Sequence, residues 1–91
     1  MATIEPLPLE VEFPDSSALA RAAYRPRNRI LDLWWRLDED DPAGRRYSYF
    51  DVPEREYRAL LAVHREGGSV GEFANRRIKP FYHYAPPKDE A

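Results

Sequence analysis

The sequence contains no cysteine and no long apolar run. The first absence excludes a disulfide framework, a thiol nucleophile and a cysteine-based zinc site. The second excludes a membrane-spanning helix, which needs roughly 18 consecutive apolar residues. The first ten residues, MATIEPLPLE, also lack the basic and apolar segments of a signal peptide. We therefore expect a cytoplasmic protein with no membrane association.

Residues that commonly carry catalysis or bind cofactors are also scarce. The two histidines, His64 and His83, lie far apart and form no metal-ligand motif. No nucleophile motif and no glycine-rich phosphate loop are present. The acidic run at residues 38–41 lacks the spaced ligands and the glycine of a calcium-binding loop, so we interpret it as a solvated hairpin tip. These observations predict a protein that is not an enzyme and has no catalytic residues, metal or cofactor.

Lysine is rare, and charges of opposite sign are separated along the chain. Only two of the 14 basic residues are lysines. Residues 1–15 carry four acids and no basic residue, residues 38–41 are all acidic, and arginines dominate residues 16–37. The net charge of −2 therefore hides a basic central part. Arginine suits bidentate contacts with phosphate and stacking on aromatic rings, although genomic base composition can produce the same bias.

Length and pattern predict a single domain with an extended arm and a tail. A chain of 91 residues is long enough to form one core. Residues 1–15 are expected to form the arm, in which the alternation of LEVEF at 9–13 fits either an edge strand or a docked segment. Residues 16–84 are expected to form the domain, and residues 85–91 a disordered tail.

Strand patterns occupy the first half of the domain and helical patterns the second half. Three strands are predicted at residues 18–24, 29–37 and 45–51, from apolar alternation and the turn residues that follow. The arm would add a fourth strand. A helix is predicted to begin at Pro53, which suits a first helical turn, and to end at the glycine pair 67–68.

A second helix is predicted directly after the first. Ser69 and Glu72 form a capping box at its start, and Pro80 stops it. Residues 81–84 are expected to be extended and packed back on the domain. The predicted fold class is therefore α+β, with a small antiparallel sheet followed by two helices packed on one face.

Residues 16–84 resemble the KTSC domain family. The resemblance lies in SSALARAAYRP, in YSYFDVP, and in EYRALL followed by FANRRIKPFY, with Tyr47 and Tyr49 as the central Tyr-x-Tyr. The DEDDPAG hairpin is longer than the family's usual turn, and Ala74 stands where the family has an aromatic residue. The resemblance implies a domain that occurs at the C-terminus of some lysyl-tRNA synthetases and alone in short bacterial and phage-like proteins. It also implies an association with RNA, tRNA included.

Aromatic residues on the predicted strands are candidates for a nucleic-acid interface. Tyr47 and Tyr49 point to one face because side chains alternate along a strand. They are either core residues or a platform on which unpaired bases stack. Trp34 and Trp35 are adjacent and must point to opposite faces. Trp34 is assigned to the mixed face, which is either open or covered by the arm or by a second copy.

Basic residues complete the candidate interface. Arg21, Arg36 and Arg46 are expected beside Trp34, where they would form an aromatic and arginine patch. A further cluster lies at the end of the second helix, where the helix dipole alone favours positive charge and a phosphate contact is the alternative. Its members are Arg76, Arg77 and Lys79.

The sequence thus favours a small non-catalytic binding module. The main hypothesis is an RNA- or tRNA-associated module that uses the candidate interface. The alternative is a protein–protein interaction module that uses an exposed aromatic face or an edge strand, for self-association or to inhibit a partner. A third interpretation is an acidic mimic that acts through the arm and residues 38–41. A docked arm could also mask the basic patch with its acids, and the oligomeric state stays open.

Overall fold

The computed structural model describes residues 7–37 and 40–86. Within these ranges the chain forms five strands and two helices, in the order strand, strand, strand, strand, helix, helix, strand. The strands are β1 (Glu10–Glu12), β2 (Leu19–Arg25), β3 (Ile30–Trp35), β4 (Arg45–Tyr49) and β5 (Tyr84–Ala85), and the helices are α1 (Glu54–Arg65) and α2 (Val70–Arg77). The fold is α+β, which confirms the predicted class.

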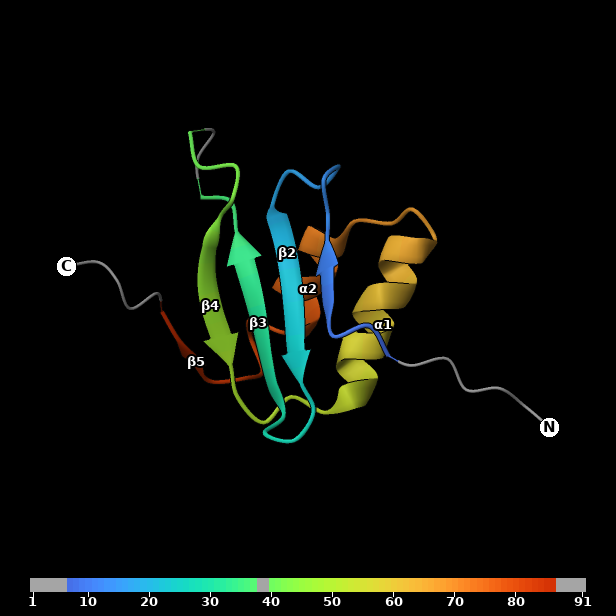
Figure 1. Ribbon diagram of the computed structural model, residues 1–91, viewed down its shortest axis with the longest axis vertical. Helices are drawn as coiled ribbons and strands as arrows, with labels where there is room; N and C mark the ends of the chain where they lie inside the picture. The colour runs from blue at the N-terminus through green and yellow to red at the C-terminus, as the bar shows by residue number, and fades with distance from the viewer. Residues whose placement is uncertain (1–6, 38–39, 87–91) are drawn as a thin grey trace.

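The strands form one antiparallel sheet in which the spatial order equals the chain order, β1-β2-β3-β4-β5 (Figure 1). The register aligns residues into rows across the sheet. Ala22 lies opposite both Val11 and Leu33, and Leu33 lies opposite Tyr47. Residues paired in this way point to the same face, so each row is either wholly on the helix side or wholly on the open side.

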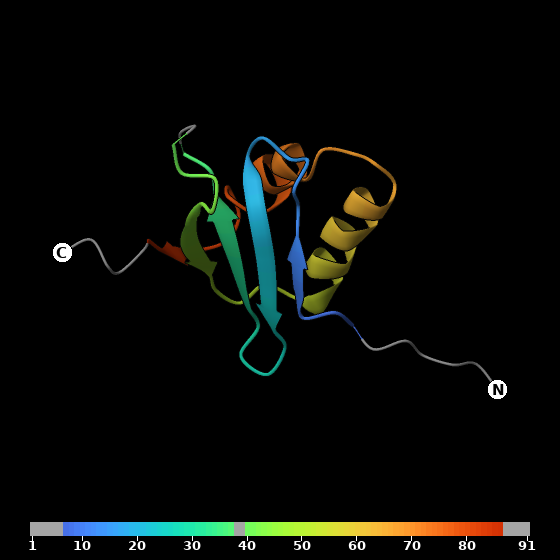
Figure 2. The same ribbon diagram turned by 45° about the horizontal axis from the view of Figure 1, so that its top comes forward.

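Both helices cover the same face of the sheet and leave the other face open (Figure 2). The core lies between the two layers, where the stacked rings of Tyr24 and Tyr57 join β2 to α1 with their centroids 5.0 Å apart. Leu31, Leu33 and Trp35 of β3 also face the helices and are buried. The apolar face predicted for this strand is thus the one that the helices cover.

The arm and the C-terminal segment add strands that correct the predicted count of three. Residues 10–12 form the edge strand β1, which is one of the two alternatives for the arm, and Phe13 after it is only 1% exposed in the core. Ala85 was assigned to the tail but pairs with Ser48 in β5. A two-residue strand carries no alternation, so the sequence could not indicate it. Residues 1–6 and 87–91, which complete the predicted arm and tail, lie outside the described residues.

The helix ends follow the predicted signals. α1 begins at Glu54, with Pro53 as the residue before it, and Gly67 follows the helix with a positive φ of 82°. Such a φ favours glycine. Ser69 caps α2, because its hydroxyl oxygen accepts a hydrogen bond from the Glu72 backbone N–H at 3.1 Å. This side chain to backbone contact confirms half of the predicted capping box.

Neither helix in the described part of the chain has the length and apolarity to cross a membrane. The acidic hairpin is described only in part, because residues 38–39 are not among the described residues. Its described end carries an ion pair between Asp41 and Arg45, at 3.6 Å.

Candidate functional site

The open face of the sheet carries a row made of Arg21, Trp34 and Arg46. Trp34 on β3 lies opposite Arg21 on β2 and opposite Arg46 on β4. The guanidinium carbon of Arg21 lies 4.5 Å from the centroid of the Trp34 ring, a cation–π distance. The structure therefore brings together three of the residues that the sequence placed in one patch. We call this row the Trp34 row.

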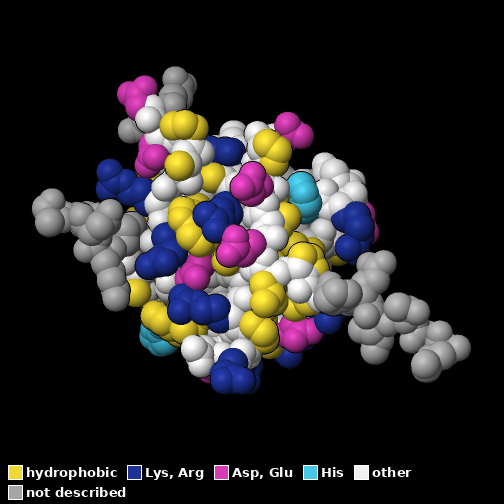
Figure 3. All heavy atoms as spheres, viewed as in Figure 1, with side chains coloured by type: hydrophobic (Ala, Val, Ile, Leu, Met, Phe, Trp, Pro, Cys, Tyr) yellow, Lys and Arg dark blue, Asp and Glu magenta, His cyan; other side chains and the backbone are white. Residues whose placement is uncertain are grey.

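Acidic residues of β1 stand at one end of the Trp34 row. Glu10 forms an ion pair with Arg21 at 2.8 Å, and Glu12 is the register partner of Arg21. Figure 3 views this face and shows Lys and Arg side chains gathered over its middle with acidic side chains beside them. Within the described part of the chain, Arg46 forms no ion pair. The described part of the arm thus reaches Arg21 through Glu10, and its strand β1 does not lie next to Trp34, because β2 separates β1 from β3.

A second row of the open face contains a buried carboxylate. Asp32 is only 4% exposed, although it lies on the face that no helix covers. The Nη2 of Arg25 donates to both Asp32 carboxylate oxygens, at 3.1 and 3.0 Å, and the Ser48 hydroxyl donates to Oδ1 at 2.5 Å. Arg25 was missed because the predicted strand stopped at residue 24. The two-residue spacing from Arg21 through 23 to 25 is the signal that places it on the same face.

Arg36 does not belong to the open patch, which corrects the sequence-based assignment. Its Nε donates to the Pro42 carbonyl at 2.8 Å. Its Nη1 contacts three more carbonyls, those of Phe13 at 3.4 Å, Leu19 at 3.3 Å and Ser16. Because β3 ends at Trp35, strand alternation no longer fixes the direction of the Arg36 side chain. The guanidinium instead joins the loop before β2 to the loop before β4.

The two tyrosines of β4 face the helix side. Tyr49 is 1% exposed, and its hydroxyl accepts a hydrogen bond from Trp35 Nε1 at 3.0 Å. Burial raises the pKa of Tyr49 above the ordinary value. Tyr47 is half-buried against the core, and the ring of Tyr84 lies 5.7 Å from each of the two tyrosine rings. Of the two alternatives, the core position applies, so the pair is not a platform for bases.

The basic residues at the end of α2 also lie on the helix side, away from the Trp34 row. Arg77 pairs with Glu56 of α1 at 3.4 Å, and Arg76 lies 4.0 Å from Glu72. The amino nitrogen of Lys79 lies 5.0 Å from the centroid of the Trp35 ring, whose side chain faces the helices. The first contact joins the two helices, the second lies within α2, and the third joins the segment after α2 to the sheet. Together they place the cluster on the opposite side of the sheet from Trp34.

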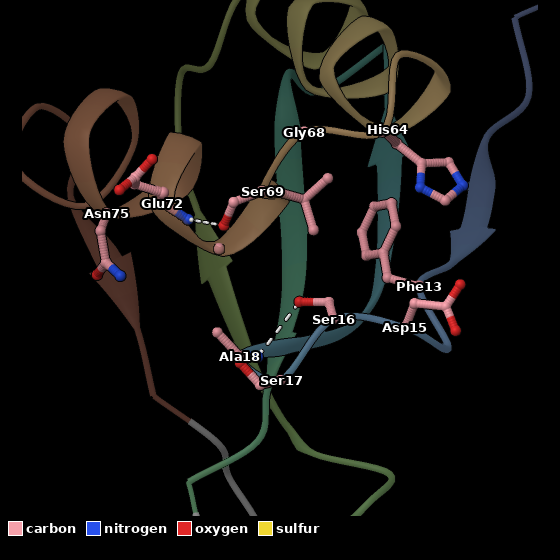
Figure 4. A pocket seen from close by; sticks show the side chains of 13 residues that line it. Phe13, Asp15, Ser16, Ser17, Ala18, His64, Gly68, Ser69, Glu72 and Asn75 are labelled. Carbon is pink, nitrogen blue, oxygen red and sulfur yellow. Dashed lines mark hydrogen bonds between the residues drawn. The ribbon is translucent and has the colours of Figure 1, made fainter.

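A pocket of about 580 Å³ lies between the loop before β2 and the start of α2 (Figure 4). Two of its serine hydroxyls accept hydrogen bonds from the backbone, since Ser16 accepts from the N–H groups of Ala18 and Leu19 and Ser69 caps α2. His64 at its rim packs edge-on against Phe13, with ring centroids 4.9 Å apart. Among the described residues, no three His, Asp or Glu side chains converge to hold a metal ion.

The architecture defines a class, a small α+β domain with an antiparallel meander covered on one face by two helices. The chain belongs to the KTSC domain family, whose model matches residues 15–82. A similar solved structure is that of a KTSC domain protein from Yersinia pestis, with 26% sequence identity and a TM-score of 0.68. That match covers 87% of this chain and 99% of the other chain. No curated protein matches the chain. The family matches the one that the motifs indicated.

Proposed function

We propose that this KTSC domain is a non-catalytic module that binds unpaired RNA, such as the single-stranded segments of a tRNA, through its open sheet face. The observation that carries the proposal is the Trp34 row, in which one indole lies between Arg21 and Arg46 on a face that no helix covers. The Trp34 indole is half-buried and the Arg21 guanidinium lies over its ring, so a base that stacks on the indole has to displace that guanidinium. The arginines beside the indole can then bind the flanking phosphates. The attachment of KTSC domains to lysyl-tRNA synthetases supports RNA as the ligand.

Fluorescence anisotropy with a labelled tRNA and a labelled oligouridine tests this proposal at low and physiological salt. We expect affinity to fall steeply with salt, because phosphate contacts release counterions. Trp34→Ala should weaken binding by about 5- to 150-fold, since one stacked base contributes about 1–3 kcal/mol. Arg46→Gln should reduce the salt slope by about one.

The matched control is Arg76→Gln, which changes the charge equally on the helix side of the molecule. We expect this variant to bind both RNAs as the parent does, apart from a small change in long-range attraction. Absence of binding to either RNA at low salt would contradict the proposal. Equal losses of RNA affinity in Arg46→Gln and Arg76→Gln would mean that net charge, and not the Trp34 row, determines binding.

Association between two copies through the β5 edge is a second candidate, favoured by exposed aromatic rings at that edge. Phe81 is 69% exposed and Tyr84 is 55% exposed. β5 pairs with β4 only at Ser48 and Tyr49, so within the described residues the rest of the outer edge of β4 is unpaired. Light scattering over a range of concentrations should then give the mass of a dimer that persists in high salt and is lost in Phe81→Ser. A monomer at every concentration would exclude this candidate.

A further inference from the structure

Asp32 is an unusual residue for the open face because it is a carboxylate that the surrounding side chains bury. A carboxylate on a solvent-facing strand position is normally hydrated, and burying it is favourable only when charged or hydrogen-bonding partners surround it. Asp32 has both kinds of partner, the guanidinium of Arg25 and the hydroxyl of Ser48. The carboxylate itself is inaccessible to a ligand, so its effect on binding has to act through Arg25.

The contact with Asp32 fixes the side chain of Arg25 but occupies only part of its guanidinium. Its side chain is 49% exposed, whereas that of Asp32 is 6% exposed. Only Nη2 donates to Asp32, and among the described residues the guanidinium of Arg25 makes no other hydrogen bond. Because the guanidinium is a rigid plane with five N–H donors, fixing one nitrogen also fixes the direction of the others. The Nε and Nη1 groups thus remain available as an oriented pair of donors.

The position of Arg25 extends the Trp34 row along β2. Arg25 lies four residues beyond Arg21 on the same face of this strand, a Cα separation of about 13 Å at about 3.3 Å per residue. The turn after Arg25 carries two more arginines, of which Arg27 is exposed and Arg29 pairs with Asp51 at 3.6 Å. Basic side chains therefore lie along β2 from Arg21, in the Trp34 row, to the β2–β3 turn.

We propose that Arg25, oriented by Asp32 and Ser48, binds a phosphate of the RNA strand whose base stacks on Trp34. The sugar–phosphate backbone then runs along β2 from the Trp34 row toward the β2–β3 turn. Asp32 and Ser48 act as positioning residues that do not contact the RNA. The proposal rests on the proposed RNA-binding function, which it deepens by naming the path of the ligand.

The decisive variant is Asp32→Asn, because charge and orientation predict opposite results. The variant gains one unit of positive charge, so an interface governed by net charge would bind oligouridine more tightly. If Asp32 orients Arg25, the variant should instead bind about fivefold more weakly at physiological salt. Arg25→Lys keeps the charge and loses the planar fork, and it should also bind more weakly. Arg25→Gln should lower the salt slope by about one.

Two further variants keep the experiment interpretable. Glu66→Gln makes the same change in charge at an exposed position after α1 and should leave affinity within about twofold of the parent. Ser48→Ala removes one partner of Asp32 without altering charge, and a weakening in this variant supports the proposal even where Asp32→Asn does not fold in a thermal melt.

The results separate this proposal from the one it rests on. Equal or tighter binding by both Asp32→Asn and Ser48→Ala would overturn the positioning role. Weaker binding by Trp34→Ala together with unchanged binding by Arg25→Gln would overturn the path along β2 while leaving RNA binding in place. Absence of RNA binding by the parent protein would overturn both.

Discussion

Arg36 illustrates how one side chain can replace a network of smaller contacts. Its guanidinium donates to carbonyl oxygens from the segments before β2 and before β4, among them that of Pro42 at 2.8 Å. Carbonyl groups at strand ends have no ladder partner and need a donor when water is excluded. Hydrogen bonds from a charged donor are stronger than neutral ones. Arg36 thus stabilises the end of the sheet at which β2 and β4 begin and β3 ends.

Replacing Arg36 by glutamine should lower the free energy of unfolding by about 2–3 kcal/mol, because several carbonyls lose a charged donor. The midpoint of urea unfolding measures this change. Arg46→Gln is the matched control, since Arg46 is exposed and makes no ion pair within the described residues, and it should stay within about 0.5 kcal/mol of the parent. Equal midpoints for the two variants would argue against the structural role of Arg36.

Tyr57 should make the stability of the protein sensitive to alkaline pH. Its hydroxyl donates to the Pro8 carbonyl at 2.6 Å, and burial, with a smaller effect of Glu10, raises its pKa to about 12. The pKa of tyrosine in an unfolded chain is about 10. Between about pH 10 and 12 the unfolded chain has therefore lost a proton that the folded protein keeps, so stability falls as pH rises.

Tyr57→Phe should flatten that decline and should cost about 1 kcal/mol near neutral pH through the lost hydrogen bond. Urea midpoints measured from pH 8 to about 12 give both quantities. Some decline should remain, because burial also raises the pKa values of Tyr24 and Tyr49. An identical slope in Tyr57→Phe would show that Tyr57 does not titrate as proposed.

At the scale of elements, α2 packs against the segment before β2 through a glycine. A Cβ placed on Gly71 would lie 2.6 Å from the Cβ of Ala18. Real Cβ atoms do not approach so closely, so the helix and the segment would have to move apart. The position thus requires glycine because of space, although its backbone conformation is ordinary for a helix.

Gly71→Ala should destabilise the protein by about 1–3 kcal/mol, as other overpacked core substitutions do. The double variant with Ala18→Gly should recover part of this loss, because it removes the opposing Cβ. Thermal or urea unfolding of the single and double variants gives the coupling energy between the two positions. Asn75→Ala, at an exposed position of the same helix, should change stability by no more than about 0.5 kcal/mol. If the effects of Gly71→Ala and Ala18→Gly are additive in the double variant, the close contact between the two positions is contradicted.

Elements with strong local signals could be predicted from the sequence, whereas β5 could not. Both ends of α1 and the start of α2 follow from Pro53, the glycine pair and the Ser69 cap, which act within one helical turn. The central strands follow from apolar alternation. β5 has two residues, and its place in the sheet depends on the pairing of Tyr84 with Tyr49 after two intervening helices. Such a contact between distant segments leaves no trace in the local pattern.

The candidate site was predictable only where strand alternation applies. Alternation placed Arg21, Trp34 and Arg46 on one face, and the register brought them into one row. It could not place Arg36, because that residue lies beyond the end of β3. Arg25 was missed through an error of one residue in the strand boundary. Local patterns define strand ends poorly, so alternation does not assign residues at strand ends to a face of the sheet.

At the scale of the whole molecule, the acidic side chains of the arm lie beside the basic side chains of the open sheet face. β1 places Glu10 and Glu12 at the Arg21 end of the Trp34 row. The same segment is needed for the fold, because Phe13 is buried in the core. The masking effect of the arm is therefore best tested by changing its charges and leaving its length unaltered.

The double variant Glu10→Gln and Glu12→Gln should bind oligouridine about two- to fivefold more tightly than the parent at low salt, because Arg21 loses its competing partner. The gain should shrink at high salt. A matched double variant, Glu66→Gln and Glu72→Gln, removes the same charge from the helix side and should gain less. Equal gains in the two double variants would attribute the effect to net charge and not to the arm.

The agreement between chain order and strand order also bears on how the protein folds. The pairings from β1 to β4 join segments that follow one another closely, so the loops that must close are short. Contacts of this kind favour rapid folding. The pairing of β5 with β4 has to wait until the chain has passed through both helices. We therefore expect the four-strand meander to form early and β5 to be the last strand to dock, and for the same reason the first to exchange its amide protons with solvent.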